Sequence, residues 1–372
     1  MVLMDLALML VISYMEVFNM KKILNQFVFV IKILVFIVLT YFLCVFINYL
    51  CKPKLVDVEI VTGFYAEEKN SLDVVYIGGS AAFVYYEPLL AYEEYGISSY
   101  VFGANTIQPE LYKYLVGEVL KRQKPKLIIL DARAFEYRDR KQAPTEVAYR
   151  NTLTGTPISK EKYEFVEEYV RPKLNLYNTL PYYLDFIKFH STSSEERYTV
   201  IESMQMMLNK YHHPYKGFYF VPRIQSQTPL DYRTDKETPM SDETNKILDD
   251  LLSYLKEQDV EVLFVVAPYI EKEIHKENFN YVERIVSENG FTFIDTNDYV
   301  DEMNINFKTD LYNINHVNLF GADKYTRFIC NYMKSHYELR DISNSPEWDK
   351  LLEDWHKERE ETIEVIKEKG NL

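Results

Sequence analysis

The sequence predicts an α/β domain built on a five-stranded parallel sheet with helices on both faces, and two patterns support this fold class. Short apolar runs of strand length alternate with segments whose apolar residues recur every three or four positions, as on the buried face of a helix. The strand runs are apolar at nearly every position, which is typical of strands buried on both faces of a sheet. The predicted strands cover 74–77, 99–102, 127–130, 262–266 and 291–294.

Local signals place helices between these strands. Pro88 opens a short helix that Gly96 ends, and Pro109 opens a longer amphipathic one. Ser241 is the expected N-cap of a helix with an apolar face. Further helices are expected at about 278–288 and 320–333, and a charged helix at 345–369 is expected to dock on the domain.

Composition excludes several classes of function. The chain has 372 residues, enough for one large domain or two ordinary ones, and a net charge of −14, which disfavours binding to nucleic acid. Its three cysteines, Cys44, Cys51 and Cys330, have neither metal-site nor disulfide-framework spacing. The sequence holds no phosphate-binding loop, dinucleotide fingerprint or zinc-protease helix, so we expect no cofactor and no metal.

Residues 27–50 form an apolar run in which Lys32 is the only charge. A bilayer core needs roughly 20 apolar residues, so this run is long enough to span it, and Lys32 can reach the interface. A buried helix of a soluble protein is the less favoured alternative. No cleavage signal follows, which predicts an uncleaved signal anchor with residues 1–26 in the cytoplasm and the large domain outside the cell. Lysines flank the run almost equally on both sides.

The remaining boundaries follow from composition. Residues 51–69 are expected to form a polar stalk, 70–338 the α/β domain, and 339–372 the C-terminal helix. Within the domain, 141–240 is expected to be a helical insertion over the C-terminal edge of the sheet, or else additional core. Because Met20 precedes two lysines, a start at Met20 stays open, in which case residues 1–19 come from an upstream start codon.

Polar residues follow three of the predicted strands at their C-terminal ends. Ser80 follows Gly79 after the first strand, Gly103 and Asn105 follow the second, and His316 lies after the fifth. Parallel sheets bind ligands at this edge, so these residues are expected to meet there. Taken singly, each has a simpler explanation, because Gly-Gly-Ser is commonly a turn and the histidine and asparagine can be caps.

Three motifs resemble the SGNH/GDSL hydrolase superfamily across most of residues 70–338: Ile77-Gly-Gly-Ser80, Phe102-Gly-Ala-Asn105, and Asn313-Ile-Asn-His316-x-Asn-x-x-Gly-Ala. The resemblance is strongest to membrane-anchored bacterial members similar to the DltD family. It implies a flavodoxin-like three-layer sandwich with Ser80 as nucleophile and His316 as general base. It also implies an oxyanion hole formed by the N–H groups of Ser80 and Gly103, with Asn105 as a side-chain donor and Gln108 as a weaker candidate.

One residue departs from the family pattern. The family carries Asp three residues before the histidine, and this chain carries Asn313. Three outcomes stay open, because Asp310 could supply the carboxylate, Ser80 and His316 could act as a dyad, or the site could bind substrate without efficient chemistry. Other candidates are weaker: the adjacent His212 and His213 are an improbable metal pair, Asp131 ends a strand, and Arg133 and Arg138 could contact an anionic polymer.

The resemblance implies an extracytoplasmic serine esterase or acyltransferase that acts on an acylated or D-alanylated envelope glycopolymer or a small ester. Envelope-synthesis proteins are its possible partners. The alternative is an inactive envelope module that binds a glycopolymer or a synthase partner.

Overall fold

The computed structural model describes residues 2–141, 145–230 and 234–370. Its centre is a five-stranded, all-parallel sheet in the order β2-β1-β3-β4-β5, which confirms the predicted fold class. The strands are β1 (Val74–Gly78), β2 (Ser99–Gly103), β3 (Leu127–Asp131), β4 (Glu261–Val266) and β5 (Thr292–Asp295). The first three are buried along their whole length, which explains why their sequences do not alternate between apolar and polar residues.

The strand order creates a crevice between β1 and β3. From β1 the chain crosses to β2 on one side and then returns past β1 to β3 on the other side. In sheets of this flavodoxin-like order, ligands bind where the direction of winding reverses, outside the C-terminal ends of the strands. Ser80 and Asp131 lie at those two strand ends, so both are next to the crevice.

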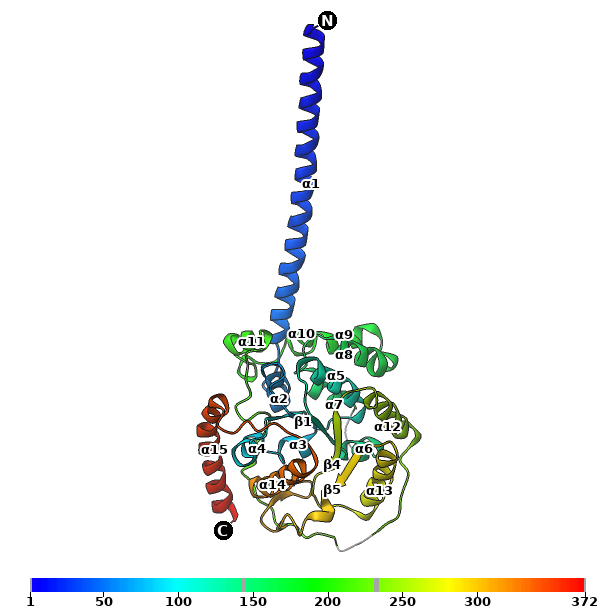
Figure 1. Cartoon of the computed structure of the whole chain (residues 1–372), viewed down its shortest axis with the longest axis vertical. Coiled ribbons are helices and arrows are strands. Elements are labelled where there is room, and N and C mark those ends of the chain that lie inside the picture. Colours follow the sequence, from blue (N-terminus) through cyan, green and yellow to red (C-terminus); the bar gives the residue numbers. More distant parts are fainter. Residues whose placement is uncertain (1, 142–144, 231–233, 371–372) are drawn as a thin grey trace.

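Helices cover both faces of the sheet (Figure 1). On one side α5, α12 and α13 follow β2, β3 and β4, and on the other side α4 packs against α14 and α15. The C-terminal helix docks as predicted, since Trp348 and Trp355 are buried. The bounds are α3 (Ser80–Phe83), α4 (Pro88–Tyr95), α5 (Tyr112–Arg122), α6 (Arg133–Asp139), α12 (Asp242–Leu255), α13 (Glu273–Glu288), α14 (Leu319–His336) and α15 (Pro346–Gly370).

A single helix, α1 (Val2–Leu50), projects from one end of the domain (Figure 1). Its stretch Lys22–Leu50 has a mean hydropathy of 2.8 and is long and apolar enough to cross a membrane. By length and composition, this stretch is a candidate for a signal anchor or a signal sequence.

The expected stalk over residues 51–69 is wrong, because this segment belongs to the folded domain. Residues 56–64 form helix α2 (Val56–Phe64), which packs on β2. Lys52, ahead of α2, is 1% exposed, and its Nζ lies 2.8 Å from the carboxylate of Asp185. Glu67, after α2, forms a buried ion pair with Lys216 at 2.8 Å. Charged residues in this segment predicted solvent exposure. Lys52 and Glu67 are nevertheless buried, because each forms an ion pair with a residue more than a hundred positions away in the sequence.

The expected insertion is helical only in its first part. Its helices are α7 (Thr145–Leu153), α8 (Lys160–Phe165), α9 (Leu176–Tyr183), α10 (Asp185–Phe189) and α11 (Val200–Met207). Residues 208–230 and 234–240 hold neither helix nor strand, and 142–144 and 231–233 lie outside the described residues. Helices α8 to α11 form one layer around the base of α1, while Asn151 of α7 donates to the carbonyl of Asn105 at the C-terminal edge of the sheet (Figure 1).

We expect Lys52→Ala to lower the free energy of unfolding by about 3–5 kcal/mol, because it leaves the buried Asp185 carboxylate without its cation. Chemical unfolding of the full chain in detergent, followed by tryptophan fluorescence, measures this change. Lys54→Ala is the matched control: Lys54 is exposed and its nearest carboxylate, on Glu202, is 3.9 Å away, so the cost should stay within about 0.5 kcal/mol. Equal costs for the two variants would contradict the burial of Lys52.

Candidate active site

Ser80 and His316 meet at the C-terminal edge of the sheet, although 236 positions separate them in the chain. The Ser80 Oγ lies 2.6 Å from the His316 Nε2, within the distance for proton transfer between a nucleophile and a general base. Both side chains are partly exposed, so a substrate can reach them. The structure therefore places a hydroxyl and an imidazole in the arrangement of an activated serine.

The turn that carries Ser80 is tightly packed. A Cβ on Gly78 would lie 2.7 Å from the Cβ of Asp131, and one on Gly103 would lie 2.5 Å from the carbonyl oxygen of Gly78. Glycine at both positions therefore lets the backbones of β1, β2 and β3 approach one another closely. The Gly79 N–H donates to the Asp131 carboxylate at 3.3 Å, which holds the turn ahead of Ser80. Asp131, at the end of the neighbouring strand β3, thus holds the turn that carries Ser80.

A short hairpin positions His316. Strands β6 (Leu311–Asn313) and β7 (His316–Val317) pair antiparallel, with Asn313 opposite His316. A two-residue loop joins them, so the spacing of three in sequence becomes a cross-strand pair. The histidine lies ahead of the following helix, since α14 begins at Leu319 with Asn318 as its N-cap.

Asn313 sets the tautomer of His316. The Asn313 Oδ1 accepts the backbone N–H of Asn315 at 2.8 Å and lies 3.1 Å from the His316 Nδ1. A backbone N–H is always a donor, so it requires an amide oxygen at this position. The Nδ1 next to that oxygen must then carry the proton, which leaves Nε2 free to accept from the serine hydroxyl. A neutral amide thus gives His316 the tautomer that a general base needs.

Asp310 does not contact the histidine. Its carboxylate accepts hydrogen bonds from Lys324 at 2.7 Å, from the backbone of Asn306 at 2.7 Å and from Thr309 at 2.8 Å. Both ring nitrogens of His316 already have other partners, Ser80 and Asn313. The carboxylate of Asp310 therefore braces the base of the hairpin.

The surroundings of His316 favour its neutral form. Burial, and next the positive charge of Arg133, lower the pKa of His316 to about 3. Arg133 is 1% exposed, its guanidinium donates to the carbonyl of Asn315 at 3.0 Å, and it lies over the ring of Tyr269 at 4.1 Å. His316 is therefore an available base, but its protonated form is costly.

Tyrosines that the sequence did not single out pack around the histidine. The Tyr312 ring stacks on the imidazole with centroids 5.3 Å apart, and the Tyr85 hydroxyl lies 2.8 Å from the Asn315 carbonyl. With 32 tyrosines in the chain, no local signal distinguishes these two from tyrosines of the core.

The predicted oxyanion residues lie at the same edge of the sheet. Ser80 is the first residue of α3, so its own N–H has no acceptor within that helix. Gly103 pairs in register with Gly78, next to the serine's turn. Asn105 donates through both its backbone and its side-chain nitrogen to Asp57, at 2.6 and 3.0 Å. The Gln108 side chain donates to the Thr106 carbonyl at 3.0 Å.

Asp57 is the partner of Asn105, and it comes from α2, the helix that follows the projecting α1. Burial raises the pKa of Asp57 to about 6, although the two hydrogen bonds from Asn105 act in the opposite direction. This contact connects α2 with the edge of the sheet that holds Ser80.

The other candidate residues have structural roles. The buried His213 Nδ1 lies 3.2 and 3.1 Å from the backbone nitrogens of Tyr215 and Gly217. Arg138 pairs with Glu110 and Glu243. A search of the described residues finds no group of three or more His, Cys, Asp or Glu that could hold a metal ion.

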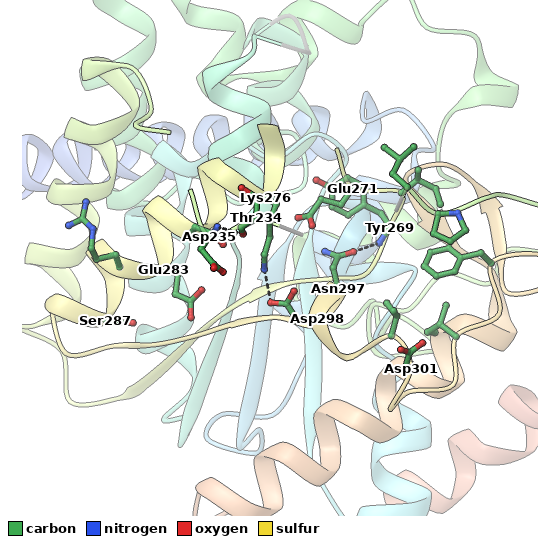
Figure 2. Close-up of a pocket in the computed structure, with 18 residues that line it drawn as sticks. Thr234, Asp235, Tyr269, Glu271, Lys276, Glu283, Ser287, Asn297, Asp298 and Asp301 are labelled. Carbon is green, nitrogen blue, oxygen red and sulfur yellow. Dashed lines mark hydrogen bonds and ion pairs between the residues drawn. The ribbon is translucent and has the colours of Figure 1, made fainter. Parts of the chain in front are cut away.

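A cavity of about 920 Å³ opens beside this edge, beyond the C-terminal ends of β4 and β5 (Figure 2). Tyr269 lines it and also stacks on Arg133, while Lys276 bridges Asp298 and Asp295. Neither Ser80 nor His316 is among the described residues that line it. The cavity is thus a neighbour of the serine site rather than part of it.

Comparison with family models, curated proteins and solved structures gives no match for this chain. The resemblance to SGNH hydrolases therefore stays a prediction, and the arguments for function depend on the geometry of the site itself.

Proposed function

We propose that the chain is a membrane-anchored serine esterase or acyltransferase whose domain lies outside the cytoplasm. The observation that carries this proposal is the 2.6 Å contact between the Ser80 hydroxyl and His316 Nε2 at the reversal point of the sheet. The tautomer imposed by Asn313 supports it, because Nε2 is then the acceptor. An acylated or D-alanylated envelope glycopolymer is the substrate class that the sequence resemblance implies.

The reaction proceeds in two half-reactions. The Ser80 oxygen attacks the ester carbonyl while its proton passes to His316 Nε2, and the carbonyl oxygen becomes an oxyanion. The intermediate then collapses, the bond to the leaving alcohol breaks, and His316 returns the proton to that alcohol. Water or an acceptor hydroxyl releases the acyl group from Ser80 by the same steps in reverse order, giving hydrolysis or acyl transfer.

The anchor proposal draws support from the packing at the end of α1. The Asn48 side chain donates to Asp185 at 3.3 Å and accepts the backbone N–H of Phe186 at 3.2 Å, and Tyr49 is buried. The last turn of α1 is thus part of the folded domain. Cleavage near this point would remove residues that the domain buries, which favours a retained anchor over a removed signal sequence.

The chemistry of the site also favours a second candidate, an inactive module that binds a glycopolymer or a synthase partner. Among the described residues, the hydrogen-bond partners of His316 are Ser80 and Asn313, neither of which is a carboxylate, and Arg133 opposes the imidazolium that acyl transfer requires. A folded protein whose serine does not react would support this candidate.

Ser80→Ala should abolish covalent labelling of the full chain by a fluorophosphonate probe, because the probe phosphonylates an activated serine oxygen. Gel fluorescence of the detergent-solubilised protein measures the labelling. Ser335→Ala removes an exposed helical serine and should leave labelling unchanged. An unlabelled wild-type chain that is folded would rule out the enzyme and leave the binding module.

Asn313→Asp should raise ester turnover by on the order of 10- to 100-fold, because a carboxylate keeps the tautomer and also stabilises the imidazolium. The gain should be smaller than the ~10⁴ known for a protease whose Asp is replaced, since Asn313 already fixes the correct tautomer. Asn331→Asp adds the same charge on the exposed surface of α14 and serves as control. A rate unchanged or reduced in Asn313→Asp would contradict the role assigned to this position.

The rate of labelling should persist in mild acid. A general base works in its neutral form, and a His316 pKa near 3 keeps it neutral well below the ordinary histidine value of about 6.5. We expect most of the labelling rate at pH 8 to remain at about pH 5, as measured by stopped time courses with circular dichroism as a folding control. Asn313→Asp raises the pKa of His316, so its loss of rate should begin at higher pH. Half-loss near pH 6.5 in the wild-type chain would contradict the lowered pKa.

A further inference from the structure

The domain is attached to α1 without a linker. Val45 and Tyr49 of α1 pack with Met206 of α11 in a small apolar cluster, and Lys52 is buried against Asp185. The direction of α1 therefore determines the orientation of the domain relative to the membrane that α1 is proposed to cross.

The length of α1 determines where the outer face of that membrane falls. The hydrocarbon core of a bilayer is about 30 Å thick and takes roughly 20 helical residues. Counted from the first apolar residues after Lys22, such a span ends near residue 43, and counted from Lys32 it ends near residue 51. These two limits bracket Val45, Asn48 and Tyr49, the residues of α1 that contact α10 and α11. Figure 1 shows the layer of insertion helices around the base of α1, and from the length of the span we infer that this layer is level with the lipid headgroups.

Helix α11 presents apolar residues to the outside at this level. It buries Ser203 and Met206 against the domain, whereas its outer face is apolar at helical spacing. Helix α9 likewise begins with two exposed apolar residues. We call the exposed set the collar: Leu176, Tyr177, Val200, Ile201, Met204 and Leu208. Isolated exposed apolar residues are ordinary, but a stripe on one helix face indicates contact with an apolar phase or partner.

The charge near α9 fits a lipid surface. Residues 171–190 contain three Lys or Arg and one Asp, within a chain whose net charge is −14, and one of the three, Arg171, is paired with the neighbouring Glu167 at 2.6 Å. The single acid, Asp185, is already paired with Lys52, and Lys173 and Lys188 are exposed. Basic side chains beside exposed aliphatic and tyrosine residues are typical of helices that lie in a membrane interface.

We propose that α9 and α11 lie on the outer surface of the bilayer that α1 spans, with the collar inserted at the boundary between headgroups and acyl chains. This inference rests on the proposed anchor. In this arrangement the membrane-spanning part of α1, its packed last turns and the collar form one rigid attachment to the bilayer, which we call the footing. The footing holds Asp57, and through it the edge of the sheet that bears Ser80, at a fixed place near the membrane, where a membrane-attached acyl polymer can reach it.

Lipid quenching in nanodiscs tests the proposal on the full chain. In a Cys44→Ser background, whose other two cysteines are buried, single cysteines carry the fluorophore NBD at four positions: Ile201→Cys and Tyr177→Cys in the collar, Leu39→Cys in α1, and Ile274→Cys in α13. The last is the matched control, an exposed isoleucine of α13, and Figure 1 shows this helix in the part of the domain away from α1. Lipids brominated on their acyl chains should quench the collar and α1 positions by about half or more and leave the control unquenched.

Other outcomes overturn the proposal in distinguishable ways. Quenching at the Leu39 position without quenching in the collar refutes the footing and keeps the anchor, and this is also the result expected if the collar awaits a membrane protein. Absence of quenching at the Leu39 position refutes the anchor and the footing together. Quenching at the control as well refutes a fixed orientation. Fluorophosphonate labelling of the same samples reports on Ser80 independently.

Discussion

The candidate site depends on one backbone N–H. The Asn315 N–H, in the two-residue loop, donates to the Asn313 side chain at 2.8 Å, so the amide oxygen is the atom that faces this donor and the imidazole. The proton on the imidazole then has to sit on Nδ1, and Nε2 has to accept from Ser80. The hairpin, through Asn318 and the bracing carboxylate of Asp310, holds this chain of contacts on the rigid sheet edge.

Asn313 orients the imidazole as a carboxylate would, but it carries no negative charge. A carboxylate in its place would orient the ring in the same way and would also stabilise the imidazolium formed during acyl transfer. Here burial and the nearby Arg133 both act against that cation. Under the proposed function, the contacts of an activated serine are in place whereas the stabilisation of the charged intermediate is weak, so we expect the proton-transfer step to limit the rate rather than the approach of substrate.

Local sequence patterns predicted the strands, the helices and the edge of the sheet that carries the site. They did not predict features that depend on contacts between residues far apart in the chain. Continuous apolar strands and glycine at strand ends were enough to place Ser80 and His316 at one edge of a parallel sheet. The stalk was misjudged because Lys52 and Glu67 look like surface residues until Asp185 and Lys216 are seen beside them. From the sequence, either Asp310 or Asn313 could be the partner of His316. The hairpin register, which places Asn313 opposite His316, and the ion pair between Asp310 and Lys324 identify Asn313 as the partner.

The proposed membrane anchor and the weak stabilisation of the imidazolium would both affect one quantity, the rate at which an encounter with substrate leads to reaction. A site that makes its imidazolium at high cost turns over slowly unless substrate is held close and in position. Confinement to a membrane surface supplies closeness without any new contact in the site, because a tethered pair meets at an effective concentration set by geometry. The rigid junction between α1 and the domain adds orientation, since neither Asn48 nor Tyr49 can move without breaking the packing of α10 and α11. If the proposed function holds, we expect the protein to act on substrates that share its membrane and to be a poor catalyst for dilute esters in solution.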